Sequence, residues 1–158
     1  MTNLYHGSVY EQQELKPGFE HSGELVQWDG TESNKNLYVT TSRAEAISQA
    51  FASMLEKNFN SVYYKTTGKS INVTIKAKHR PTIEQFKKYT IILYTIRYEE
   101  KDGWRKVNND QNGLDNEWKT TQTIKDNIVK VEKIDIEDWL KDKAFAITME
   151  GMPIYAEW

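Results

Sequence analysis

The sequence predicts an α+β fold in a single domain spanning residues 1–158, with a mixed or antiparallel β-sheet and two or three helices. Three observations favour this class. Several short stretches alternate apolar and polar residues, as half-buried strands do. One long stretch has apolar residues at helical spacing. No internal repeat, low-complexity run or linker divides the chain, whose length suits one domain with a substantial core.

The N-terminal third is expected to contain two short strands separated by a loop. Leu4–His6 is the first strand, and Gly7 is expected to end it. The segment Glu20–Lys35 is polar and rich in Gly, Ser, Asn and Asp, which predicts a surface loop. Asn36–Thr40 is the second strand, and it leads directly into a helix.

The helix that follows has the clearest signals in the chain. Ser42 is a favourable N-cap, and Glu45 three residues later completes the pattern of a capping box. The next apolar residues fall on one helical face: Ala46, Ile47, Ala50, Phe51 and Met54 or Leu55.

The rest of the chain predicts short elements in the following order. Residues 70–79 alternate as a strand, 81–90 suit a short helix that begins at Pro81, and 91–100 suit another strand. Residues 101–117 lack apolar periodicity and predict a long loop. Residues 127–139 alternate again, and 144–158 can supply one or two final strands.

Composition excludes several function classes. A formal net charge of −2 gives no overall basic field for nucleic acid, and the absence of cysteine excludes disulfides, thiolate catalysis and cysteine-based zinc sites. The three histidines have no metal-ligand spacing, so no metal is expected. The first residues, "MTNLYHGS", have neither the basic nor the apolar region of a secretion signal, and no apolar run reaches membrane-spanning length. We expect a cytoplasmic, monomeric protein with no membrane partner.

Two stretches could together form a binding pocket. In "YHGS", His6 can bond a sugar hydroxyl, Gly7 permits close approach of a ligand or another backbone, and Ser8 adds a hydroxyl. In "LYVTTS", Tyr38 can stack on a flat heterocycle, while Thr40 and Ser42 lie at a helix N-terminus that favours phosphate. The alternative for each is structural: a partly buried histidine that closes a turn, a core tyrosine, and hydroxyls that only cap the helix.

The motifs "YHGS", "LKPG" and "NLYVTTSRAEAISQAFAS", within residues 4–55, resemble the N-terminal half of small ADP-ribosyltransferases, in particular rifampin ADP-ribosyltransferases. This resemblance implies a split β-sheet core, NAD as co-substrate, His6 on a ribose of NAD and Tyr38 stacked on nicotinamide. Gly7, Ser8, Thr40 and Ser42 would make further NAD contacts. Ser8 replaces the threonine of the rifampin enzymes and keeps the hydroxyl.

The superfamily also supplies a catalytic acid at the start of a late strand. Glu117, where the 101–117 loop meets the next strand, fits that place, and Asp115 resembles the first member of a paired-acid pattern. Glu132 is the runner-up. A carboxylate here would oppose the positive charge that develops on the sugar. The alternative is a solvated loop in a chain with 23 acidic residues.

The expected function is therefore transfer of ADP-ribose from NAD to a protein, nucleic-acid or small-molecule acceptor, with release of nicotinamide, by a bacterial or phage-borne enzyme. The sequence does not name the acceptor, whose choice we assign to the loops Glu20–Lys35 and Lys101–Asn116. The main alternative is a non-catalytic module of the same fold that binds ADP-ribose or a protein. A 2′-phosphotransferase is disfavoured, because the chain has only four arginines.

Overall fold

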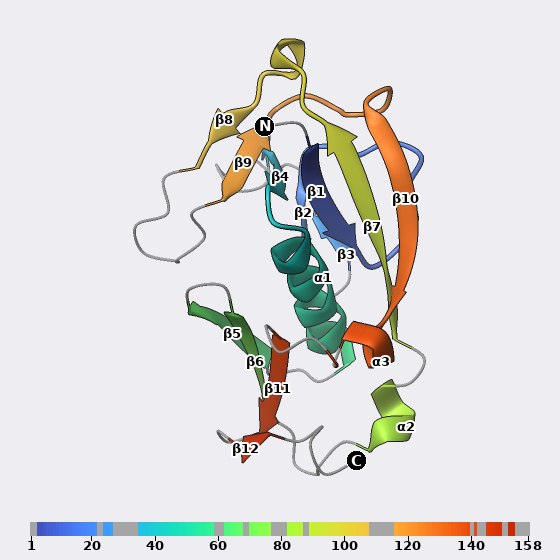
Figure 1. The fold of residues 1–158 in the computed structure, drawn as a ribbon, viewed down its shortest axis with the longest axis vertical. Coiled ribbons are helices and arrows are strands. Elements are labelled where there is room, and N and C mark those ends of the chain that lie inside the picture. Colours follow the sequence, from blue (N-terminus) through green and yellow to red (C-terminus); the bar gives the residue numbers. More distant parts are fainter. Residues whose placement is uncertain are drawn as a thin grey trace.

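The computed structural model describes residues 3–21, 24–26, 35–58, 62–67, 70–76, 82–86, 89–107, 116–139, 141, 145–149 and 152–153. Within these ranges the chain is a small α+β fold, mostly antiparallel sheet with few helices, as the sequence predicts (Figure 1).

The larger sheet has six antiparallel strands in the order β10-β7-β1-β4-β9-β8. Their bounds are β1 Asn3–Ser8, β4 Leu37–Thr40, β7 Thr90–Arg97, β8 Arg105–Lys106, β9 Glu117–Thr120 and β10 Ile128–Asp135. The N-terminal strand β1 is central because it pairs with both β4 and β7, so residues far apart in the sequence meet around it.

A smaller sheet has the order β12-β11-β6-β5, and its β11–β6 pair is parallel. The bounds are β5 Val62–Thr67, β6 Ser70–Ile75, β11 Phe145–Met149 and β12 Met152–Pro153. A separate hairpin joins β2 Phe19–His21 to β3 Glu24–Val26. The helices are α1 Arg43–Asn58, α2 Ile83–Phe86 and α3 Ile136–Trp139, with a 3-10 turn, η2, at Glu100–Asp102.

Helix α1 connects the two sheets. It packs along β1 and β7 of the larger sheet and also contacts β5 and β6 of the smaller one (Figure 1). Its buried face forms the first core, with the inward side chains of both sheets and of α3: Ala46, Ile47, Ala50, Phe51, Leu55, Val73, Ile75, Ile91, Leu93, Ile136, Trp139 and Ile147.

The other face of the larger sheet has its own core. Its buried members are Leu4, Leu15, Leu37, Val39, Ile92, Tyr94, Ile96, Trp104 and Ile124. Trp118 packs against this second core from β9, so both tryptophans near the 101–117 segment contribute to apolar packing. The larger sheet is thus covered on both faces, by α1 on one and by the segment around Leu15 and Ile124 on the other.

The structure corrects several sequence-based boundaries, including the following three. β1 continues through Gly7 to Ser8, because β7 pairs with it along its whole length. The β2–β3 hairpin lies partly within the expected loop Glu20–Lys35, most of which is outside the described residues. The expected loop 101–117 contains β8, which forms a ladder with β9. No helix in the described part of the chain is long and apolar enough to cross a membrane.

Candidate functional site

The candidate site begins with a row of paired residues across three strands. Tyr5 of β1 pairs with Thr40 of β4, and Thr40 pairs with Glu117 of β9. Paired residues in an antiparallel sheet direct their side chains to the same face. Glu117 is the first residue of β9, as the sequence predicts for the acid, and its backbone carbonyl accepts a bond of 2.9 Å from the Val107 amide.

Tyr38 and Glu117 lie on the same face of the sheet. Leu37 and Val39 belong to the second core, so alternation along β4 places Tyr38 and Thr40 on the opposite face, which α1 covers. The Thr40 hydroxyl bonds to Glu45 in α1, which confirms this direction. Glu117 has the same orientation because it pairs with Thr40. Two of the three residues expected to form the core of the site therefore lie on one face of the β4–β9 pair, two positions apart in the strand register.

His6 lies on the other face. It pairs with Tyr94, a member of the second core, and the two ring centroids are 6.4 Å apart. The His6 ring nevertheless reaches β4, because its Nδ1 lies 2.8 Å from the backbone carbonyl oxygen of Tyr38. A carbonyl only accepts, so Nδ1 carries the proton, and in the neutral ring Nε2 is left as the acceptor. The structure links His6 to the backbone of Tyr38 but does not place the two rings side by side.

Gly7 is required for the packing of α1. A Cβ at this position would lie 2.2 Å from the carbonyl oxygen of Ala46 and 2.8 Å from the Cβ of Ala50. The sequence allowed either a ligand or another backbone to approach Gly7 closely. In the structure it is the backbone of helix α1 that does so.

Ser8 is fully buried and bonds locally. Its hydroxyl donates to the carbonyl of Tyr10 at 2.8 Å and accepts from Gln12 Nε2 at 3.0 Å. The predicted NAD contacts of Gly7 and Ser8 remain predictions.

The hydroxyls of Thr40 and Ser42 bond within the chain at the start of α1. Ser42 acts as the predicted N-cap, because its hydroxyl accepts from the Glu45 amide at 3.2 Å. The reciprocal half of the capping box is absent, which corrects the sequence-based expectation. The Ser42 amide instead donates to the Thr40 hydroxyl at 3.0 Å, and that hydroxyl donates to Glu45 Oε2 at 2.9 Å. A phosphate at this helix end would also meet the negative charge of Glu45.

The side chain of Glu45 is a part of the site whose position the sequence did not predict. Glu45 is only 6% exposed, and its second oxygen accepts from Asn116 Nδ2 at 3.3 Å. The Asn116 carbonyl also accepts from the Thr41 amide at 3.0 Å. The sequence feature that could have indicated this position is the series of hydroxyl residues before the helix. The Thr40 hydroxyl can accept from the Ser42 amide, which leaves Glu45 free to bond elsewhere.

The alternative acids are placed differently. Glu132 of β10 lies on the α1 face but bonds to Arg43 Nη2 at 3.2 Å, and Lys130 Nζ is 3.5 Å from the same oxygen. The Glu132 side chain is 21% exposed and forms ion pairs with both cations. Asp115 lies outside the described residues.

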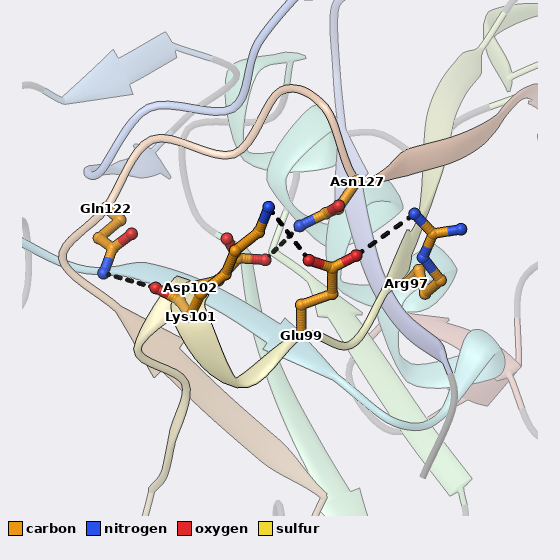
Figure 2. A network of polar contacts seen from close by, with 6 residues as sticks. All are labelled: Arg97, Glu99, Lys101, Asp102, Gln122 and Asn127. Carbon is orange, nitrogen blue, oxygen red and sulfur yellow. Dashed lines mark hydrogen bonds and ion pairs between the residues drawn. The ribbon is translucent and has the colours of Figure 1, made fainter.

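A second polar network lies where β7 ends (Figure 2). The Glu99 carboxylate forms ion pairs with Arg97 and Lys101. The backbone carbonyl of Lys101 accepts a hydrogen bond of 3.3 Å from Gln122 Nε2. The buried carboxylate of Asp102 accepts from Asn127 Nδ2. The Lys101 ammonium, which hydrogen-bonds Glu99, holds the pKa of that carboxyl below its usual value, and Arg97 adds to the effect. Among the described residues, neither network belongs to a group that could hold a metal ion.

Comparisons with known proteins do not assign the site. No family model matches the chain, and no match was found among curated proteins or solved structures. A function therefore has to be inferred from the residues and their placement.

Proposed function

We propose that the protein is an NAD-dependent ADP-ribosyltransferase that releases nicotinamide and transfers ADP-ribose to a protein, nucleic-acid or small-molecule acceptor. The observation that carries the proposal is the placement of Tyr38 and Glu117 on one face of the β4–β9 pair, where α1 begins. The two residues are 79 positions apart in the sequence, and a stacking ring and a carboxylate are what this reaction needs.

The reaction breaks the bond between C1′ of the nicotinamide ribose and the pyridinium nitrogen. The electron pair leaves with neutral nicotinamide, and positive charge builds on the sugar. The Glu117 carboxylate would stabilise this oxocarbenium-like charge and accept the proton of the incoming acceptor. The acceptor nucleophile then forms the new bond at C1′. Tyr38 would hold the nicotinamide ring by stacking.

The roles of His6 and of the fold complete the proposal. The ribose contact that the resemblance implies for His6 is compatible with Nε2 as an acceptor for a sugar hydroxyl, since Nδ1 is bonded to Tyr38. The arrangement of a larger and a smaller sheet around α1 is the feature that would correspond to the split sheet of ADP-ribosyltransferases.

The test is transfer of label from NAD that carries a labelled adenylate group, with nicotinamide release measured in parallel. A bacterial lysate and candidate small molecules serve as acceptors. We expect Glu117→Gln to cut turnover by about a hundredfold, with NAD affinity within a few-fold of wild type. Glu132→Gln, the same change at the ion-paired glutamate, is the matched comparison and should retain activity. If the folded wild-type protein neither transfers label nor releases nicotinamide, the proposal is wrong.

The position of His6 favours a second candidate, a non-catalytic binding module for ADP-ribose or a protein partner. His6 lies on the face of the larger sheet opposite Tyr38 and Glu117, so a ligand bound on one face would have to reach across the sheet to contact all three side chains. Calorimetry with ADP-ribose separates the candidates. Binding without NAD turnover supports the module, whereas nicotinamide release that disappears in Glu117→Gln excludes it.

A further inference from the structure

The carboxylate of Glu45 connects the three elements that carry the proposed site. Glu45 belongs to the first turn of α1, Thr40 ends β4, and Asn116 immediately precedes β9. One carboxylate oxygen accepts from the Thr40 hydroxyl at 2.9 Å and the other from the Asn116 amide at 3.3 Å. Both partners adjoin Glu117, one across the ladder and one along the chain.

This placement exceeds what a helix cap requires. A surface glutamate bonding the Ser42 amide would complete the capping box without burial. Glu45 is instead 6% exposed, and a buried carboxylate is tolerated only where hydrogen bonds replace its lost hydration. Here the Thr40 hydroxyl and the Asn116 side-chain amide supply those bonds. The Thr40 hydroxyl also accepts a hydrogen bond of 3.0 Å from the Ser42 amide, which caps that amide in place of Glu45.

The residue before the proposed acid is held from two directions. The Asn116 side chain bonds to Glu45, and its carbonyl accepts from the Thr41 amide at 3.0 Å. The side-chain bond therefore adds to the backbone contact at the point where the chain enters β9. The direction of the Glu117 side chain depends on that entry point, because it is the first residue of the strand.

We infer that Glu45 is a positioning residue that, through Asn116 and Thr40, fixes the Glu117 carboxylate relative to Tyr38. This inference deepens the proposed ADP-ribosyl transfer and rests on it. Glu45 itself touches no reacting atom. Its effect comes from holding the acid in the geometry that transition-state stabilisation demands, where small displacements cost large factors in rate.

The test exchanges the two partners of the Glu45–Asn116 bond. Glu45→Gln removes one acceptor, and Asn116→Asp places two carboxylates together, so each single variant should lower the kcat of nicotinamide release at least tenfold with KM for NAD within threefold. The double variant Glu45→Gln/Asn116→Asp restores an amide facing a carboxylate in reversed order. We expect its kcat to return to within threefold of wild type.

Two controls separate positioning from loss of stability. Ser48→Ala removes a buried bond of 3.1 Å from Trp139 Nε1 to the middle of the same helix, so it should lower the melting temperature without changing kcat. In a Glu117→Gln background, Glu45→Gln should cause no further loss, because the group it positions is already gone. Hydrogen exchange of the Thr41 amide reports its bond to the Asn116 carbonyl, and the measurement needs no NAD. We expect exchange to be faster in the single variants and to return to the wild-type rate in the double variant.

Each failure has its own pattern. Wild-type kcat in the single variants, no recovery in the double variant, or an additive loss in the Glu117→Gln background overturns the positioning role alone. Absence of nicotinamide release by the wild-type protein overturns the proposed function and this inference with it, while Thr41 exchange would still report the bond.

Discussion

Two networks in this molecule use the same hydrogen-bonding chemistry at different places in the fold. Glu45 and Asp102 are both buried carboxylates that accept from an asparagine amide, Asn116 in one case and Asn127 in the other. A threonine hydroxyl completes each network: Thr40 bonds the Glu45 carboxylate, and Thr120 bonds the Asp102 carbonyl.

The difference lies in what each network connects. Asp102 joins the turn after β7 to the loop before β10 (Figure 2). Glu45 joins a helix to the end of β4 and the start of β9, the strands that carry Tyr38 and Glu117. The two buried carboxylate–asparagine pairs therefore have the same chemistry but fix different backbone segments.

The largest expected effect is on the stability of the fold and comes from a comparison of two glycines, Gly7 and Gly103. Gly7→Ala should destabilise the fold by about 3 kcal/mol, because the new Cβ would meet the Ala46 carbonyl at 2.2 Å and backbone cannot yield. Gly103→Ala should cost about 1 kcal/mol, the strain of a positive φ of 71°, since its nearest neighbour is the flexible Gln122 side chain at 3.0 Å. Urea unfolding measures both, and equal costs would contradict the close packing of α1 on β1.

The next largest effect on stability is expected when the buried carboxylate of the second network, Asp102, is removed. Asp102→Ala should destabilise the fold by about 2 kcal/mol, because it leaves the buried Asn127 amide without its acceptor. Nicotinamide release, measured under conditions where the variant is folded, should keep its wild-type kcat, in contrast to Glu45→Gln. A tenfold loss of kcat in Asp102→Ala would show that the rate reports general stability rather than the geometry at Glu117.

A smaller effect compares two aromatic residues. Tyr38→Ala should weaken NAD binding by roughly 1–2 kcal/mol if its ring stacks on nicotinamide, and Tyr38→Phe should bind almost normally. Tyr98, whose ring lies edge-on to Trp118 with centroids 6.2 Å apart beside the second core, is the matched control. Tyr98→Ala should lower the melting temperature and leave NAD affinity unchanged. Calorimetric titration with NAD measures both, and normal affinity in Tyr38→Ala would remove Tyr38 from the site.

The smallest expected effect is a pH dependence of stability that comes from Glu99, in the second network. Lys101 and Arg97 lower the folded-state pKa of Glu99, so its stabilising contribution is present above the unfolded value of 4.5 and is lost as pH falls through the lower folded pKa. Glu99→Gln should therefore melt slightly below wild type at pH 6, and the two should converge in acid. A difference that persists unchanged in acid would show that the lost stability does not come from the ionised carboxylate.

The sequence predicted much of the local structure. The Ser42 cap, the apolar face of α1, the alternation in β6 and β10 and the strand-like run of β7 all indicated elements that form, because each depends on residues close together in the chain. The start of β9 at Glu117 was also predicted from its loop-to-strand transition. The β8 strand was missed because its two residues gain their hydrogen bonds from β9, and no local pattern encodes that pairing.

The sequence by itself therefore determined the long helix and the strands that have a clear local pattern, together with the chemical types available for a site. Only the tertiary structure decided which face each candidate occupies. Strand register places Tyr38 and Glu117 together and His6 on the other side, and a shift of one residue would reverse each assignment. The same long-range pairing turned Glu45 from an ordinary helix cap into a link between α1, β4 and the residue before β9, because its partner Asn116 lies 71 positions away in the chain.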